Sequence, residues 1–139
     1  MTHFLNLKDL SSNQIEEILL RASRLKKERD PTKHLEGKFL ALIFEKASTR
    51  TRISFEVAMH QLGGLASFFP ISELHLGRGE PLEDTAKVIS SMVDAVVLRT
   101  LSHKTIDKFA TVSSVPVING LSDLSHPCQL LADLLTFYE

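Results

Sequence analysis

The strongest constraint on the fold is a continuous apolar run at positions 39–44, FLALIF. A strand with only one buried face alternates apolar and polar residues, whereas a continuous apolar run of this length is typical of a strand buried on both faces of a parallel sheet. Three further short apolar segments, at residues 65–69, 95–98 and 115–118, have the same character. The sequence therefore predicts four buried strands.

Helical segments separate these strands. Gly63 and Gly64 supply an end signal for the first of them, and Pro81 supplies a start signal for the second. Alternation of strand and helix with short connections is typical of right-handed βαβ units. The predicted fold class is α/β, a three-layer α/β/α arrangement with a four-stranded parallel sheet. We expect the helices at about residues 50–62, 81–92 and 105–112, and from residue 127 to the end of the chain.

An amphipathic helix precedes the first strand. Ser11 with Gln14 three residues later has the capping-box pattern. The charged run at residues 26–30 is the solvated last turn, and Pro31 stops the helix. One face of this helix carries Ile15, Ile18, Leu19, Ala22 and Leu25.

The composition is that of a globular domain. A length of 139 residues fits a single domain, residues 1–139, which can bury a core without disulfides. With 43% hydrophobic and 24% charged residues, the chain is neither disordered nor fibrous. A formal net charge of −1 provides no global field for nucleic acid or for an anionic membrane, so we expect neither as a partner.

The single cysteine, Cys128, can form neither an internal disulfide nor a multi-thiolate zinc site. Residues 1–13 lack the pattern of a secretory signal, and no stretch approaches the roughly 18 apolar residues of a membrane span. We therefore expect a cytoplasmic protein.

A cluster of hydroxyl and guanidinium groups follows the first predicted strand and enters a helix: Ser48, Thr49, Arg50, Thr51 and Arg52. Free backbone N–H groups and the helix dipole favour an anion at such a helix N-terminus. An ordinary hydroxyl cap followed by surface arginines is the alternative. The place directly after a buried strand, with an arginine fork available to grip oxygens, favours a phosphate site.

Two further polar residues end up at the same edge of the predicted sheet. Arg99 follows the third strand, and His126 precedes Pro127 at the start of the last helix. Each has a simpler interpretation, a strand-end charge for Arg99 and a packed or surface histidine for His126. Ligands of parallel α/β sheets bind at this edge, which favours the functional interpretation.

Other common motifs are missing. The segment Gly77-Arg78-Gly79 begins like a dinucleotide fingerprint, but Leu82 occupies the position of the third glycine. The sequence contains no GxxxxGK[ST] phosphate loop. His126 and Cys128 have no further thiols beside them, which argues against structural zinc.

Three segments resemble the aspartate/ornithine carbamoyltransferase family. Residues 44–56, FEKASTRTRISFE, are similar to its carbamoyl-phosphate signature, and residues 126–136, HPCQLLADLLT, to its second block. Residues 76–85, LGRGEPLEDT, extend the likeness, which covers essentially the whole chain. Lys46 and the LLAD segment look like the ornithine branch, whereas Arg78-Gly79-Glu80 resembles the Lys-Gly-Glu of aspartate enzymes.

The resemblance implies a transferase of arginine biosynthesis that carries the carbamoyl group to the δ-amine of ornithine, giving citrulline and phosphate. It implies a trimer, or a multiple of trimers, of two-domain chains, with this chain as the carbamoyl-phosphate domain and the acceptor domain absent. No metal and no organic cofactor are implied. Aspartate or putrescine carbamoyltransferase stays open, as does a non-catalytic anion-binding module for the domain alone.

The resemblance also implies residue roles. Residues 48–51 would hold the phosphate, and Arg99 would bridge the phosphate and the carbonyl oxygen. Thr51, Arg99 and His126 would polarise the carbonyl. Gln129 would accept a hydrogen bond from the carbamoyl NH₂ group.

Two more residues are expected to act between subunits. His75 and Arg78 lie on the loop before Pro81. By the same resemblance they would reach the site of a neighbouring subunit.

Overall fold

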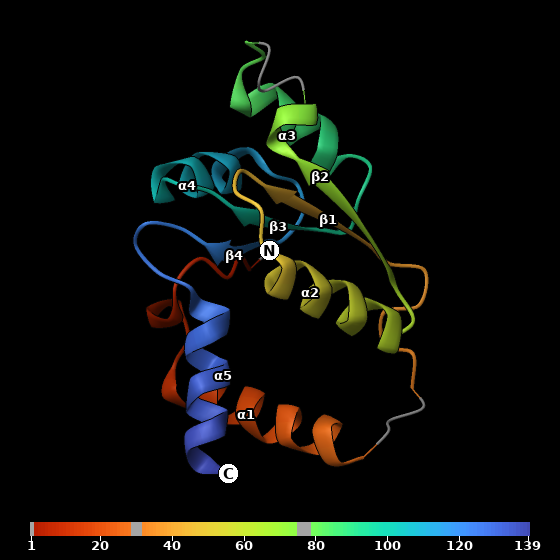
Figure 1. The fold of residues 1–139 in the computed structure, drawn as a ribbon, viewed down its shortest axis with the longest axis vertical. Helices are drawn as coiled ribbons and strands as arrows, with labels where there is room; N and C mark the ends of the chain where they lie inside the picture. The colour runs from red at the N-terminus through yellow and green to blue at the C-terminus, as the bar shows by residue number, and fades with distance from the viewer. Residues whose placement is uncertain (1, 29–31, 75–78) are drawn as a thin grey trace.

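The computed structural model describes residues 2–28, 32–74 and 79–139 (Figure 1). Its centre is one sheet of four parallel strands in the order β2-β1-β3-β4. This confirms the predicted α/β class and the four-stranded parallel sheet. The strands are β1 (Phe39–Phe44), β2 (Leu65–Pro70), β3 (Ala95–Arg99) and β4 (Val117–Leu121).

Helices cover both faces of the sheet. Figure 1 shows α2 on one side and α3 and α4 on the other. Helices α1 and α5 pack against each other, and α5 also contacts β4. No helix within the described residues is long and apolar enough to cross a membrane. The helices are α1 (Ser12–Lys27), α2 (Thr49–Gln61), α3 (Leu82–Ser90), α4 (His103–Val112) and α5 (Pro127–Tyr138), with short 3₁₀ turns at Leu7–Asp9 and Ile71–Glu73.

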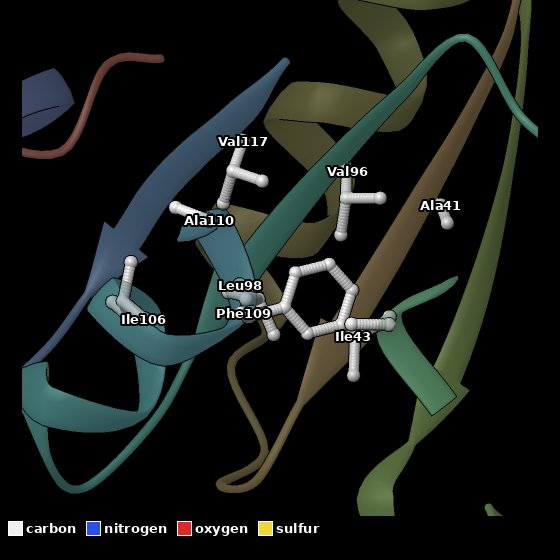
Figure 2. Packing of buried hydrophobic residues seen from close by; sticks show 9 residues of the cluster. Ala41, Ile43, Val96, Leu98, Ile106, Phe109, Ala110 and Val117 are labelled. Atoms are coloured by element: carbon white, nitrogen blue, oxygen red, sulfur yellow. The ribbon is translucent and has the colours of Figure 1, made fainter. Parts of the chain in front are cut away.

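Strand β1 contributes to a hydrophobic cluster on each face, because successive side chains of a strand point to opposite sides. Ala41 and Ile43 pack in the cluster under α3 and α4, where Phe109 is fully buried (Figure 2). Leu40, Leu42 and Phe44 pack in the cluster under α2. Two-sided burial of β1 is what the continuous apolar run predicts.

The fourth strand differs from its prediction, since it spans Val117–Leu121 rather than residues 115–118. Val115 instead belongs to a turn, in which its N–H and C=O both bond the Ser113 hydroxyl. The strand continues beyond its apolar residues because the buried Asn119 side chain finds backbone partners, so a polar residue is tolerated there.

Helix α4 begins two residues earlier than predicted, at His103 rather than at residue 105. The carboxylate of Asp123 accepts a hydrogen bond of 2.7 Å from the backbone N–H of His103. The helix N-terminus is therefore capped by a residue from a different loop, which local sequence patterns do not reveal.

The strand order places a topological switch point beside β1. The chain leaves β1 through α2 to reach β2, then crosses back through α3 to β3 on the other side of β1. The carboxyl ends of β1 and β3 are thus neighbours, with Phe44 opposite Arg99. Ligands of open α/β sheets bind at this position.

Candidate functional site

The first part of the candidate site is the segment that follows β1 and begins α2. Ser48 is the N-cap residue of α2, yet within the described part of the chain its hydroxyl makes no capping hydrogen bond. Thr49 and Arg50 are exposed, and Thr51 is half-buried. The ordinary-cap alternative for Ser48 is therefore not what this helix adopts. Its hydroxyl and the first N–H groups of α2 are of the kind that can bind an anion at a helix N-terminus.

Arg99 links the two halves of the site. It lies at the end of β3, and its Nη1 donates to Thr51 Oγ1 across 3.3 Å. Its Nε atom is buried without a hydrogen-bond partner among the described residues. Burial lowers the pKa of the Arg99 guanidinium, which still remains charged at neutral pH. A buried donor of this kind can bind an oxygen acceptor.

His126 lies at the start of α5, where it is the residue before Pro127. Its Nδ1 atom is buried and has no hydrogen-bond partner in the described residues. Burial lowers the pKa of His126, the charge of Arg99 lowers it further, and Asp133 opposes both. The imidazole is therefore mostly neutral at pH 7, so it can donate one proton without adding a charge.

Gln129 lies in the first turn of α5 and is exposed. Its Nε2 donates to Asp133 Oδ1 across 2.8 Å. This bond orients the amide and leaves its oxygen as the group that can accept from a ligand N–H.

The structure thus brings Thr51, Arg99 and His126 to one edge of the sheet. His75 and Arg78, the residues expected to act between subunits, lie outside the described residues.

The second arginine of the cluster after β1 does not belong to the site. Arg52 lies with its guanidinium carbon 4.1 Å from the centre of the Phe68 ring. Its Nε bonds Glu56 Oε1 at 2.9 Å. The Phe68 contact links α2 to β2, whereas the Glu56 contact lies within α2. Arg52 is thus already engaged by these two partners.

Glu45 is a site-forming residue that the sequence does not single out. Its backbone N–H donates to the carbonyl oxygen of Arg99 (2.8 Å), and its Oε2 accepts from the N–H of Leu101 (2.7 Å). One residue therefore ties the loop after β1 to the loop after β3. Nothing in the local sequence marks this role, because both partners lie more than fifty positions away.

Cys128 lies between His126 and Gln129 in the sequence, and its thiol is largely buried. Its Sγ lies 3.8 Å from the carbonyl oxygen of Asn119, and burial raises the pKa of the thiol to about 11. Within residues 2–28, 32–74 and 79–139, no group of three or more His, Cys, Asp or Glu side chains is placed to hold a metal ion.

The arrangement has groups that could stabilise an oxyanion. A helix N-terminus, the Arg50 fork and the buried Arg99 guanidinium all favour negative charge, while a neutral imidazole stands nearby. Such preorganised donors can hold a phosphate and polarise a carbonyl oxygen beside it.

Comparisons with known proteins agree with this geometry. The sequence model described as "Aspartate/ornithine carbamoyltransferase, carbamoyl-P binding domain" matches residues 2–139. The ornithine carbamoyltransferase of Methylococcus capsulatus is 53% identical over 137 residues, covering 99% of this chain and 46% of that protein. That of Halorhodospira halophila is 56% identical over 142 residues, covering 100% of this chain and 47% of the relative.

Solved structures give the same result. The crystal structure of anabolic ornithine carbamoyltransferase from Campylobacter jejuni superposes with a TM-score of 0.94 at 52% identity, covering 99% of this chain and 45% of that one. The Pyrococcus furiosus ornithine carbamoyltransferase gives a TM-score of 0.93 at 50% identity, covering 98% and 44%. The chain spans about half the length of the relatives it matches.

Proposed function

This chain belongs to the aspartate/ornithine carbamoyltransferase family, and we propose that it forms the carbamoyl-phosphate-binding part of an ornithine carbamoyltransferase. The observation that carries the proposal is the convergence of the α2 N-terminus, Arg99 and His126 at the switch point of the sheet. The names of the relatives support ornithine as the acceptor.

In the proposed complex, residues 48–51 hold the phosphate through hydroxyl and backbone donors and the Arg50 fork. Arg99 spans the phosphate and the carbonyl oxygen, because it lies opposite the end of β1 and reaches Thr51. Neutral His126 donates its ring proton to the same carbonyl oxygen. The amide oxygen of Gln129 accepts from the carbamoyl NH₂ group.

The reaction is an acyl transfer. The lone pair of the ornithine δ-amine attacks the carbonyl carbon, a C–N bond forms, and negative charge develops on the carbonyl oxygen. The C–O bond to phosphate then breaks, phosphate leaves, and the amine loses a proton to give citrulline. Donors preset toward the developing oxyanion supply the main stabilisation, with a typical loss of about 10²- to 10³-fold in rate when one is removed.

The remaining parts of the proposal concern the whole protein. We propose a homotrimer, or a multiple of trimers, that acts in the cytoplasm in arginine biosynthesis. A further domain binds the acceptor, and His75 and Arg78 act at the site of a neighbouring subunit. The exposed apolar residues Ile53 and Val57 beside Arg50 on α2 are compatible with contact between subunits there.

Replacing Arg50 by lysine tests the phosphate site. The substitution keeps the charge but loses the planar fork, so we expect carbamoyl phosphate to bind about tenfold or more weakly in calorimetry. The matched control is Arg52→Lys, two residues along the same helix, which contacts Phe68 and Glu56 instead and should leave the affinity almost unchanged. Equal affinities for the wild type and Arg50→Lys would remove Arg50 from the site. In the complete enzyme, assays with ornithine, aspartate and putrescine identify the acceptor by its carbamoylated product.

A further inference from the structure

We propose that His103 is a positioning residue, which holds the turn of residues 122–125 so that His126 stays fixed within reach of Arg99. The proposal rests on the proposed function only for the identity of the ligand. The contacts that support it are independent of any ligand.

His103 is the first residue of α4, and it is buried, with 9% of its surface exposed. Its Nδ1 lies 2.8 Å from Ser122 Oγ, and its Nε2 lies 3.4 Å from Asn6 Nδ2 and 3.6 Å from Asp107 Oδ1. Its backbone N–H donates to Asp123 Oδ1. One residue therefore contacts the N-terminal segment, its own helix and the turn before α5.

Both ring nitrogens of His103 have polar partners. Nε2 faces the Asn6 amide nitrogen and the Asp107 carboxylate, and Nδ1 pairs with the Ser122 hydroxyl. The same hydroxyl oxygen accepts from the backbone N–H groups of Leu124 (3.3 Å) and Ser125 (3.4 Å) and donates to the carbonyl of Ser125 (3.4 Å). Fixing Ser122 therefore fixes the whole turn.

The far end of the turn is held as well. The carbonyl of Ser125 accepts from Ser122 N–H (3.0 Å) and from Nδ2 of the fully buried Asn119 (3.3 Å). The Ser125 hydroxyl bonds Asn6 Oδ1 (3.3 Å). His126 is the next residue, so the direction in which its ring leaves the backbone is set by this network.

None of the His103 contacts described above is with Thr51, Arg99 or His126. We therefore assign His103 a positioning role and not a catalytic one. Without the Ser122 contact the turn is joined to the start of α4 only through the bond from the His103 backbone N–H to Asp123. The His126 ring then moves more freely, gains contact with water and spends less time near Arg99. Both burial and the charge of Arg99 lower the pKa of His126, so loosening must raise this pKa toward its ordinary value.

The experiment measures the pKa of His126 by NMR titration, with its signal assigned from His126→Asn. His103→Leu and Ser122→Ala should both raise the pKa of His126 toward its ordinary value and weaken carbamoyl phosphate binding about fivefold, the worth of one net hydrogen bond. His103→Asn keeps an N–H near the Nδ1 position and should restore most of both properties. Ile106→Val, at a buried position of the same helix, is the control for a general loss of stability and should leave the pKa of His126 unchanged.

An unchanged pKa of His126 in both His103→Leu and Ser122→Ala overturns the proposal. The same shift in Ile106→Val also overturns it, because the effect would then follow stability alone. If the pKa rises as expected but the wild type does not bind carbamoyl phosphate, the positioning role is supported and the proposed function fails. Ser122→Ala changes a single hydroxyl in a turn, so it keeps the test decisive if His103→Leu does not fold.

Discussion

Cys128 lies between His126 and Gln129 in the sequence, yet we expect its thiol to be unreactive. Thiolate is the reactive form of cysteine, and a pKa of about 11 leaves the thiol almost fully protonated at pH 8. Iodoacetamide should therefore alkylate the folded protein much more slowly than the urea-unfolded protein, as followed by mass spectrometry. Equal rates in the two states would contradict burial of this thiol.

Glu45 should matter to ligand binding although it touches no ligand in the proposed complex. Glu45→Ala removes the acceptor for Leu101 N–H and so loosens the loop that follows Arg99, while the backbone bond between residues 45 and 99 remains. We expect carbamoyl phosphate affinity to fall about fivefold or more, since a charge-assisted hydrogen bond is lost. Glu45→Gln keeps an acceptor oxygen and should lose less. If Glu45→Ala and Glu45→Gln bind equally well, the contact has no positioning value.

Some residues of the candidate site can be predicted from local sequence patterns, whereas others depend on contacts that only the folded chain makes. Residues 48–51 and His126 are predictable because each lies next to a strand end or a helix start that local patterns reveal. Asn119 and His103 escape such reasoning, because their value depends on partners such as Leu5 and Ser122 that only the tertiary fold brings near. Whether the predicted residues bind carbamoyl phosphate stays a prediction.

At the scale of elements, the turn from α2 to β2 depends on two glycines. Gly63 has a φ of 86°, and a Cβ atom on Gly64 would lie 2.5 Å from Met59 Cε and 3.0 Å from the Leu35 carbonyl oxygen. Gly64→Ala should therefore destabilise the protein by about 1–3 kcal/mol in urea unfolding, because the backbone must move. The control is Gly37→Asn, where φ is 73° and a Cβ atom meets nothing within 4 Å, and asparagine tolerates this conformation. Equal stability of Gly64→Ala and the wild type would show that the turn relaxes at no cost.

Element prediction succeeds where burial and local capping act together. Strand β1 has its predicted bounds, and the capping box at Ser11 and Gln14 forms as the sequence indicates. Strand β4 and the start of α4 are displaced because Asn119 and Asp123 make hydrogen bonds with distant segments. Hydrophobic pattern identifies which segments are strands, but the polar contacts of the folded chain set their ends.

At the scale of the molecule, we expect the 139-residue chain, expressed by itself, to fold and to bind carbamoyl phosphate without forming citrulline. Residues 48–51, Arg99, His126 and Gln129 all belong to it, whereas orienting the amine is worth roughly 7 to 11 kcal/mol of the barrier and falls to the acceptor domain in our proposal. The measurement is an NMR titration with carbamoyl phosphate, followed by addition of ornithine and a citrulline assay. Citrulline formation at the rate of a complete enzyme would contradict this division of labour.

The central place of β1 has a consequence for how the chain reaches its native state. The β1-α2-β2 unit closes over a short stretch of sequence, while pairing of β1 with β3 joins residues such as Phe44 and Arg99 that are far apart along the chain. Contacts of large sequence separation carry the greater closure entropy and form more slowly. The N-terminus of α2, which binds the phosphate in our proposal, can thus form early. The Arg99 guanidinium reaches it only after β1 and β3 have paired. Capture of the ligand in the proposed complex therefore requires that β1 and β3 have already paired.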